Sequence, residues 1–561
     1  MKSSDGKRRL VNWVIIIGLV VVTIMPRLYL LLHTHSYSSD GVSYLSTALW
    51  IRNPEMIGEV PKRIYFILFP LLTLLADIFT HNITLAGRII NLLVGVAIPV
   101  VAFLIGRKIF GHVVGLIGWL FCAINPILIM QSAEIRGDSL FALATLVAIL
   151  FFEKIDWKNP RLRDSIFFAL VLGMCQLART NGVMYLFVVI PLWLWIHKGS
   201  EPFDKYLHKQ TMYFQKALTP FTKPWFWRTL VPFALVFAAI SSIPNILLAV
   251  RGEPRPSMFM YTYLDGNIAA LGDRESAFFK LNADATEYQI IEDTSHAGMK
   301  DVIDSLPSLP HKFAKNFGYA VMLLFGPAIE VILKLSIILL PLLFYIFYYW
   351  GEVKIPDGTG RLLFWSWPSF ILLPLINVED LYFLPLIPIL MLLAGWLLNV
   401  TSSLGWIAKW RGWVLAILIV IIIVPMSAKS MSDIKAEAKY INPYLLAGEW
   451  IGKNTPPDSK IMARNPEVFF HSMRHGYRMP IEDLNRTLIF ALHRDVKYLV
   501  FGPSEMNKRK DLFLEAYKEV YNSGKASRLK LVKTIDTGQD IVYIVEVIPE
   551  NFKVGSLPKT G

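Results

Sequence analysis

Charged residues are scarce in this sequence, and long apolar runs take their place. Asp, Glu, Lys and Arg together make up 18% of the 561 residues, whereas 54% are hydrophobic. Soluble domains carry about a quarter charged residues. The apolar residues also come in runs of about twenty, the length that a membrane-spanning helix needs, rather than in amphipathic stripes. This composition excludes an ordinary soluble protein and predicts a polytopic α-helical membrane protein.

Cysteine is nearly absent. The only two, Cys122 and Cys175, both lie within apolar runs. Their number and spacing exclude a disulfide framework and a cysteine-based metal site, so we expect buried thiols. Internal repeats and low-complexity tracts are also missing from the sequence.

The net charge of +13 does not indicate nucleic-acid binding, because no motif combines basic and aromatic residues. Much of the excess lies in short loops, as the positive-inside rule requires of a membrane protein. Lys7, Arg8 and Arg9 precede the first apolar run, residues 11–32, and predict a cytoplasmic N-terminus. That run is too long for a signal peptide and is followed by no small-residue cleavage site, so we expect a retained helix.

From this start, the alternation of apolar runs and basic loops predicts about eleven membrane crossings. Residues 64–79 are apolar but few, and Pro70 interrupts them. We interpret them as a juxtamembrane segment on the outer side, since a full crossing would place the basic turn 106–111 outside. The expected spans are 11–32, 85–105, 113–130, 139–152, two short spans within 166–195, 229–250, 318–350, 362–376, 381–398 and 413–425.

This reading divides the chain into a transmembrane domain, residues 1–430, and a soluble α/β domain, residues 431–561, on the outer side. Two larger outer loops are expected, one at 33–84 that includes the juxtamembrane helix and one at 251–317. In the soluble domain, the patterns predict helices and strands between composition breaks. The expected helices are 437–453, 481–494 and 505–522, and the expected strands are 460–463, 498–501 and 541–547.

Every unusual polar cluster in the short loops falls on the outer side. Ionisable groups near spans are costly and usually line a cavity or pair with one another. Their location on the same side of the membrane, rather than any single residue, therefore indicates a functional site. Two plainer interpretations stand beside it: Asp40 is a solvated loop aspartate, and the second loop forms a local ion pair that caps helix ends. The clustered residues are Asp40, Glu134, Arg136, Asp138, Arg179, Asn181, Glu379 and Asp380.

Five segments in order resemble the C-type (GT-C) glycosyltransferases, polytopic enzymes that use polyprenyl-phosphate sugars. The resemblance is strongest to the protein O-mannosyltransferases and to the bacterial lipid A aminoarabinose transferase, and it covers roughly residues 1–430. Two departures are a glycine, Gly41, where the mannosyltransferases carry a second acidic residue, and Leu381 where relatives often have arginine. The segments are Ser39 to Tyr44, Leu85 to Asn91 with Gly106 to Gly111, Asn125 to Asp138, Leu177 to Gly182, and Tyr382 to Pro388.

The resemblance implies transfer of a sugar from a polyprenyl-phosphate carrier to a protein, lipid or glycan acceptor on the outer face of the membrane. An inverting single displacement needs one general base, and we assign that role to Asp40, with Glu134 and Asp138 as supporting carboxylates. A divalent metal is chemically compatible with Asp40 and Asp138, but no spacing requires one.

Cations must hold the charge that the leaving phosphate gains. The candidates are Lys62, Arg63, Arg88, Arg136 and Arg179. Plainer interpretations exist. Lys62, Arg63 and Arg88 can extend to the membrane interface as anchors, and Arg179 with Asn181 can satisfy the backbone of a broken helix. The residues expected to bind the acceptor or the sugar are Tyr44, Asn181, Glu379, Asp380 and Tyr382.

Two other classes of function remain open at this point. A transporter or flippase would also be polytopic with charged groups in its spans, although it should show internal repeats and charges near the bilayer midplane. A non-catalytic scaffold would present the outer domain as a binding module.

Overall fold

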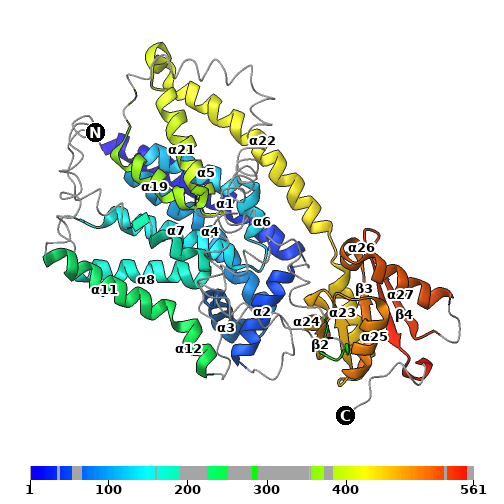
Figure 1. Ribbon diagram of the computed structural model, residues 1–561. Helices are drawn as coiled ribbons and strands as arrows, with labels where there is room; N and C mark the ends of the chain where they lie inside the picture. Colours follow the sequence, from blue (N-terminus) through cyan, green and yellow to red (C-terminus); the bar gives the residue numbers. More distant parts are fainter. Residues whose placement is uncertain are drawn as a thin grey trace, which may run out of the picture.

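The computed structural model describes residues 2–34, 38–52, 66–157, 161–186, 188–189, 224–250, 281–282, 284–287, 353, 355–371, 383–522 and 527–552. A bundle of apolar helices forms one part of the molecule, and a small α/β domain at the C-terminal end forms the other (Figure 1). The helices of the first part are α1 (Lys2–His33), α2 (Ser39–Arg52), α3 (Leu68–Thr80), α4 (Ile83–Ile109), α5 (His112–Ile124), α6 (Pro126–Gln131), α7 (Gly137–Lys154), α8 (Leu162–Ala178), α11 (Pro224–Ser241), α12 (Ile243–Val250), α19 (Asp357–Ile371), α21 (Leu386–Thr401) and α22 (Arg411–Lys439).

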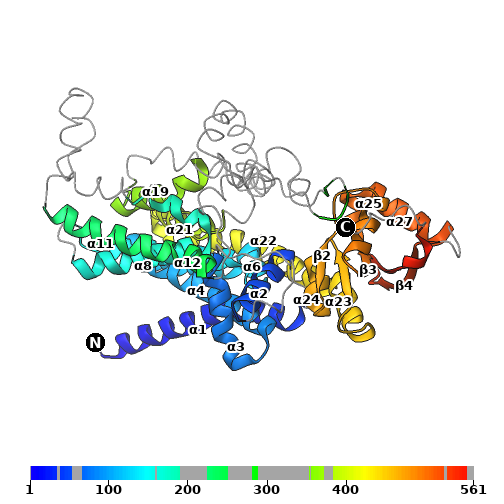
Figure 2. The same cartoon turned by 60° about the horizontal axis from the view of Figure 1, so that its bottom comes forward.

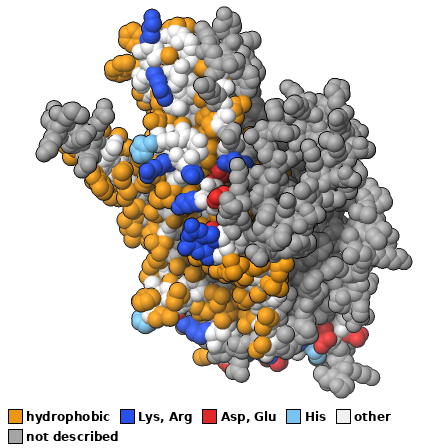
Figure 3. Space-filling model, turned by 90° about the vertical axis from the view of Figure 1, so that its left-hand side faces the viewer, with side chains coloured by type: hydrophobic (Ala, Val, Ile, Leu, Met, Phe, Trp, Pro, Cys, Tyr) orange, Lys and Arg blue, Asp and Glu red, His pale blue; other side chains and the backbone are white. Residues whose placement is uncertain are grey.

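Three segments of the described chain are helical, long and apolar enough to cross a membrane: Leu10–His33, Ile83–Ile109 and Gly405–Asn454. Large apolar side chains along α1, α3, α4 and α22 are exposed, and apolar side chains cover most of the described surface of one face (Figure 3). Such an apolar exterior suits lipid rather than water. The fold is therefore that of a helical membrane protein. The count of eleven crossings stays a prediction, since several expected spans lie outside the described residues, among them 318–350.

The helix α3 covers the expected juxtamembrane segment. Its 13 residues extend about 20 Å, less than the roughly 30 Å of a bilayer core. It packs against α4, whose start is capped by Asn82, the side chain of which accepts a hydrogen bond from the Leu85 N–H at 3.0 Å.

The expected single span 113–130 is wrong in detail, because it is two helices, α5 and α6. The break lies at Asn125, whose side chain caps α6 by accepting from the Leu128 N–H at 3.1 Å, with Pro126 at the first position of α6. Proline cannot donate the hydrogen bond that a continuous helix needs. The carbonyl of Cys122, which the N–H of residue 126 would have served, accepts from Arg27 Nη2 at 3.3 Å instead. The carbonyl of Ile124, which loses the Leu128 N–H to Asn125, accepts from the Ser430 hydroxyl of α22 at 2.6 Å.

Loops that alternate in the sequence meet on one end of the bundle. The Arg361 guanidinium at the start of α19 binds Glu153 at the end of α7 through two hydrogen bonds, of 2.8 and 2.7 Å. A Cβ atom added to Gly358 would lie 2.6 Å from the side chain of Ile109. Described residues of three segments expected inside the cell, namely Ile109, Glu153 and Gly358 with Arg361, thus lie at one end of the bundle, although the compartment itself stays a prediction.

The C-terminal domain contains a five-stranded mixed sheet in the order β2-β1-β3-β5-β4. Strand β1 pairs in parallel with β2 and β3, whereas β5 pairs antiparallel with β3 and β4. Helices cover the sheet (Figure 2). The elements are α23 (Pro443–Asn454), β1 (Lys460–Ala463), α24 (Pro466–Ser472), β2 (Gly476–Arg478), α25 (Leu484–His493), β3 (Val496–Phe501), α26 (Pro503–Lys508), α27 (Lys510–Asn522), β4 (Leu529–Asp536) and β5 (Ile541–Val547).

The expected helix 437–453 is confirmed at its end, because α23 runs from Pro443 to Asn454, but its start is wrong, because α22 runs on to Lys439 and the chain leaves the helix before Pro443. Asn442 caps α23 by accepting from the Tyr444 N–H at 3.0 Å, and proline at the first helical position favours a new start there. The elements α24, β2 and β4 were not expected from the sequence.

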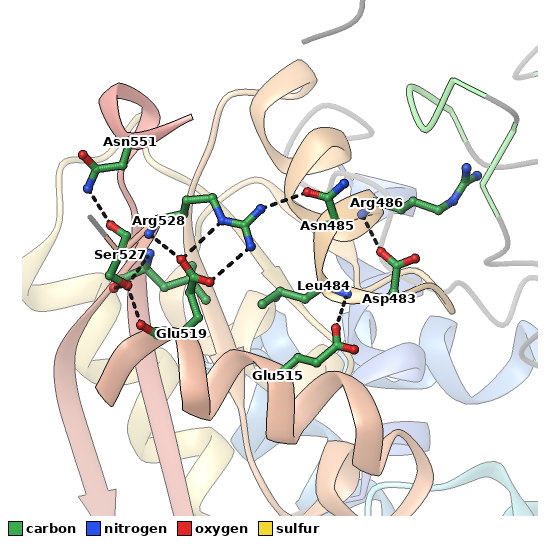
Figure 4. Close-up of polar contacts among 10 residues, drawn as sticks. Asp483, Leu484, Asn485, Arg486, Glu515, Glu519, Ser527, Arg528 and Asn551 are labelled. Carbon is green, nitrogen blue, oxygen red and sulfur yellow. Dashed lines mark hydrogen bonds and ion pairs between the residues drawn. The ribbon is translucent and has the colours of Figure 1, made fainter. Parts of the chain in front are cut away.

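Polar contacts of α27 hold the edge of this domain together (Figure 4). Glu519 pairs with Arg528 at 3.2 Å, which lowers the pKa of Glu519 against the opposing effect of burial. Glu515 accepts from the Leu484 N–H at 3.0 Å, and Arg528 donates to Asn485 at 2.9 Å. These bonds fix α27 to the start of α25.

A short piece of the expected outer loop 251–317 packs on this domain. The Leu281 N–H donates to Glu482 at 3.0 Å, and Arg486 donates to the Asn282 carbonyl at 2.6 Å. Leu281 and Ala285 are buried in the domain's apolar core. The described piece of this loop, residues 281–282 and 284–287, is therefore attached to the C-terminal domain, and the side of the membrane on which both lie stays a prediction.

We predict that Gly95→Ala destabilises the membrane domain by about 1–3 kcal/mol, because overpacking forces neighbouring atoms apart. A Cβ atom there would lie 2.3 Å from the Cβ of Ser132. In thermal unfolding in detergent, adding Ser132→Gly should restore most of the loss. Gly18→Ala, where nothing lies within 4 Å, is the matched control and should not destabilise. Equal melting temperatures for Gly95→Ala and Gly18→Ala would contradict this packing.

Candidate functional site

The helix α2 places two of the predicted residues on one face. Asp40 lies in its first turn, and Tyr44 follows one turn later, a spacing that aligns side chains on a helix. The Tyr44 ring is buried, with its centroid 5.4 Å from that of Phe69 and 6.2 Å from that of Phe66. Aromatic packing therefore fixes the side of α2 that carries Asp40.

The loop between α6 and α7 approaches α2 closely, because glycines remove the side chains that would separate them. A Cβ atom on Gly87 of α4 would lie 3.3 Å from both Ile135 and Leu45. One on Gly137 would lie 3.0 Å from the Tyr44 hydroxyl. The loop residues 132–136 are thereby held between α4 and α2.

Arg136 in this loop joins carboxylates from two parts of the chain. Its Nη2 atom lies 2.5 Å from Asp40 Oδ2, and its Nη1 atom lies 3.4 Å from Glu134 Oε2. Its Nε atom lies 3.6 Å from Asp138 Oδ2. The side chain of Arg136 makes no hydrogen bond that caps α7, and its shortest bond goes to Asp40 of α2. A purely local capping pair does not account for this arrangement.

The second arginine of the site, Arg179, pairs with Asp138 through Nη1 and Oδ1. Both groups are buried, with 8% and 1% of their side chains exposed. Arg179 ends α8, and its guanidinium lies 5.7 Å from the centroid of the Phe66 ring. The turn after it folds back tightly on α8, since a Cβ atom on Gly182 would lie 2.5 Å from the backbone of Cys175.

Burial and charge shift the acid–base behaviour of this cluster. Burial raises the pKa of Glu134, and Arg136 only partly offsets that effect. Burial alone would lower the pKa of Arg136, but the charges of Asp40 and Glu134 outweigh it and raise the pKa. Arg136 is thus held as a cation among carboxyl groups, and Glu134 takes up a proton more readily than an exposed glutamate.

The structure brings together Asp40, Tyr44, Glu134, Arg136, Asp138 and Arg179 of the predicted residues. Arg88 instead donates hydrogen bonds of 2.6 and 3.3 Å to the carbonyls of Leu31 and Leu30 at the end of α1. Asn181 lies in a 3₁₀ turn, Thr180–Tyr185, directly after Arg179. The predicted residues Lys62, Arg63, Glu379, Asp380 and Tyr382 lie outside the described residues.

Phe66, which contacts both Tyr44 and Arg179, was not expected to belong to the site. Its only signal in the sequence is its place within a short apolar run. Within the described ranges, no group of three or more His, Cys, Asp or Glu side chains is arranged to hold a metal ion. Asp40 and Asp138, the two carboxylates considered for a divalent metal, both contact Arg136, and a metal there stays a prediction.

Residues 66–227 match the family model described as dolichyl-phosphate-mannose-protein mannosyltransferase. This region includes the loop 132–136, Asp138 and Arg179. No curated protein sequence matches the chain.

Solved structures share the fold over most of the chain. ArnT from Cupriavidus metallidurans bound to undecaprenyl phosphate has a TM-score of 0.55 at 13% identity, with 98% of this chain and 99% of that chain covered. Archaeal oligosaccharyltransferase AglB from Archaeoglobus fulgidus, in complex with an inhibitory peptide and a dolichol-phosphate, has a TM-score of 0.51 at 12% identity, covering 89% of this chain and 72% of that chain. At such low sequence identity, the structural similarity shows the fold alone. With the family model, it confirms the predicted GT-C resemblance. Together, these comparisons indicate a glycosyltransferase.

We predict that Arg179→Gln destabilises the protein by about 3–5 kcal/mol, because it leaves the buried carboxylate of Asp138 without its main partner. The double variant Asp138→Asn, Arg179→Gln should recover a large part of this loss, since no unpaired charge remains. Thermal unfolding in detergent would compare the two. A double variant no more stable than Arg179→Gln alone would contradict the pairing.

Proposed function

We propose that this membrane glycosyltransferase moves a sugar from a polyprenyl-phosphate carrier to an acceptor by an inverting single displacement, with Asp40 as the general base. The observation that carries the proposal is the joining of Asp40 to Arg136, and of Asp138 to Arg179, in one cluster built from three separate parts of the chain: the start of α2, the start of α7 and the end of α8. One carboxylate is enough for such a reaction, and the cluster also supplies the cations that a phosphate leaving group requires.

In this step, the acceptor oxygen or nitrogen forms a bond to the anomeric carbon of the sugar from the face opposite the phosphate. The bond between that carbon and the phosphate oxygen breaks, and its electron pair leaves with the polyprenyl phosphate. The acceptor proton passes to the Asp40 carboxylate. Arg136, at 2.5 Å, fixes the orientation of that carboxylate, and orientation of this kind is a large part of catalysis.

Arg136 and Arg179 are the described cations that can meet the leaving phosphate. They share the cluster with three carboxyl groups, Asp40, Glu134 and Asp138. A donor phosphate would therefore bind by taking over one arginine's bonds from a carboxyl group. The contact of Arg136 with Glu134, at 3.4 Å, is the one that a phosphate would displace most easily. Burial raises the pKa of Glu134, and a carboxyl group that becomes protonated no longer holds the arginine by its charge.

A protonated Glu134 would also be a hydrogen-bond donor, suited to a hydroxyl or phosphate oxygen. Tyr44, in the same cluster, is proposed to line the sugar site. The apolar helices beside the cluster would accommodate the polyprenyl chain. We place the reaction on the outer face of the membrane, because the N-terminal basic residues and the alternation of spans support that orientation.

We expect Asp40→Asn to lower the rate of sugar release or transfer by at least about 100-fold, because general-base catalysis contributes on the order of 10²–10⁴. The measurement uses proteoliposomes and a panel of labelled donors that includes dolichyl-phosphate mannose and undecaprenyl-phosphate aminoarabinose. Asp433→Asn, which removes an acidic residue of α22 paired with Lys429 at 2.6 Å, is the matched control and should keep full activity. Equal rates for Asp40→Asn and wild type would remove Asp40 as the base. Solute uptake without turnover of any donor would favour a transporter.

We expect Arg136→Lys to raise the KM for the lipid donor about tenfold or more, because a single ammonium group cannot replace a planar guanidinium that meets several oxygens at once. The comparison of KM and kcat with the same donor panel tests this. A variant with unchanged KM would exclude Arg136 from donor binding.

A further inference from the structure

The C-terminal domain contains a buried carboxyl group that faces the helical bundle. Glu467 lies in the first turn of α24 and is 4% exposed. One of its oxygens accepts from its own backbone N–H, whereas Oε2 has no hydrogen-bond partner within the described part of the chain. A buried carboxyl group without a full set of partners is costly, so its presence calls for an explanation.

The helix that carries Glu467 packs directly on the helix that carries Asp40. Contacts join α24 to α2, and the two helices lie next to each other in both views (Figure 1, Figure 2). One continuous cluster of buried apolar side chains includes Trp50 of α2 together with Val468 and Phe469 of α24. The C-terminal domain is therefore fixed to the bundle by an apolar interface.

The C-terminal ends of the two helices line one open cavity of about 800 Å³, with Leu49 and Arg52 from α2 and Phe470 and Met473 from α24. Asp40 lies in the first turn of α2 and Glu467 in the first turn of α24, so the two acidic residues stand at corresponding ends of two helices that pack on each other.

The other charged and titratable groups that face Glu467 belong to its own domain. Arg478 of β2 opposes the negative charge of Glu467, and its Nη1 also donates to the carbonyl of Arg464. The guanidinium of Arg464 bonds to Ser504 and acts on Glu505. Glu505 of α26 is a second acidic neighbour. Tyr444 and Tyr440 complete the surroundings. Burial, with the charges of Asp40 and Glu505 added, raises the pKa of Glu467 to about 7, and Arg478 only partly opposes this.

We propose that the C-terminal domain supplies Glu467 to the active site as a positioning residue, a second carboxyl group that acts on Asp40 through its charge. This proposal rests on the proposed function of Asp40 as the base. Ionisation of one of two neighbouring carboxyl groups makes ionisation of the other less favourable. An ionised Glu467 therefore favours uptake of the acceptor proton by Asp40 and opposes the pull of Arg136.

The first test is a thermal-unfolding cycle on the full chain in detergent, with Glu467→Gln, Asp40→Asn and the double variant at pH 5 and pH 8. The raised pKa of Glu467 means that the folded state holds its proton more strongly than the unfolded state. Stability from this group is thus present at low pH and is lost as the pH rises to about 7. Glu467→Gln should raise the melting temperature by a few degrees at pH 8 and by much less at pH 5, which lies only slightly above the ordinary pKa of 4.5.

The coupling between the two carboxyl groups is the decisive quantity. At pH 8 the stabilisation by Glu467→Gln should be smaller in the Asp40→Asn background, because the repulsion has already been removed. Glu449→Gln, a half-exposed carboxylate of α23, is the matched control and should add independently to Asp40→Asn. Full additivity of Glu467→Gln with Asp40→Asn at pH 8 would overturn the proposal, and this outcome does not depend on any activity.

The second test is the pH profile of labelled-sugar release from dolichyl-phosphate mannose and undecaprenyl-phosphate aminoarabinose. Wild type should show a rate that rises through about pH 7, and Glu467→Gln should lack this rise and be on the order of tenfold slower at pH 8. A loss by the same factor at every pH would mark a merely structural residue and overturn the proposal. Loss of the rise in Glu467→Gln together with an active Asp40→Asn would reject the proposed base instead.

Discussion

The buried ion pair between Asp138 and Arg179 is the constraint on which the site depends. A carboxylate that is 1% exposed must have a cation, since an unpaired buried charge costs several kcal/mol. Arg179 supplies it from the end of α8 and thereby fixes where α7 begins. The pair also leaves Arg136 available for Asp40. Without Arg179, Arg136 would be the cation closest to Asp138, at 3.6 Å, and the orientation of Asp40 would be lost with it.

The same principle fixes the opposite end of the bundle. Glu153, 3% exposed, is paired with Arg361 by two hydrogen bonds, so α7 is held at both of its ends by a buried acid and an arginine from a later helix. Between these pairs, α7 contributes mostly apolar side chains to the core. The charged residues of α7 thus determine its depth in the bundle, and the apolar residues determine its packing.

Composition was sufficient to predict a polytopic membrane protein, because hydrocarbon imposes its constraints on the sequence itself. Loop charge sorts the loops into two faces, which stays a prediction. It put Asp40, Arg136, Asp138 and Arg179 on one shared side, where ionisable groups usually line a cavity or pair with one another. The break at Asn125 and Pro126 was misread because the apolar run continues through it. Glu467 could not be found, because the packing of its helix on α2 depends on how one domain packs on another. Arg88 has the residue type of a phosphate ligand, but its position lets it serve the carbonyls at the end of α1.

The helix α22 continues without interruption from Arg411 to Lys439, across the point at which the composition changes from membrane to soluble. Only Tyr440, Ile441 and Asn442 separate it from α23. A helix turns by about 100° per residue, so the rotational setting of the C-terminal domain about this axis is encoded in the number of residues in α22. Lengthening α22 by one residue would swing the domain around the bundle, whereas lengthening it by a whole number of turns would lift the domain without rotating it. The length of this helix therefore determines both how far the C-terminal domain stands from the bundle and in which direction it faces.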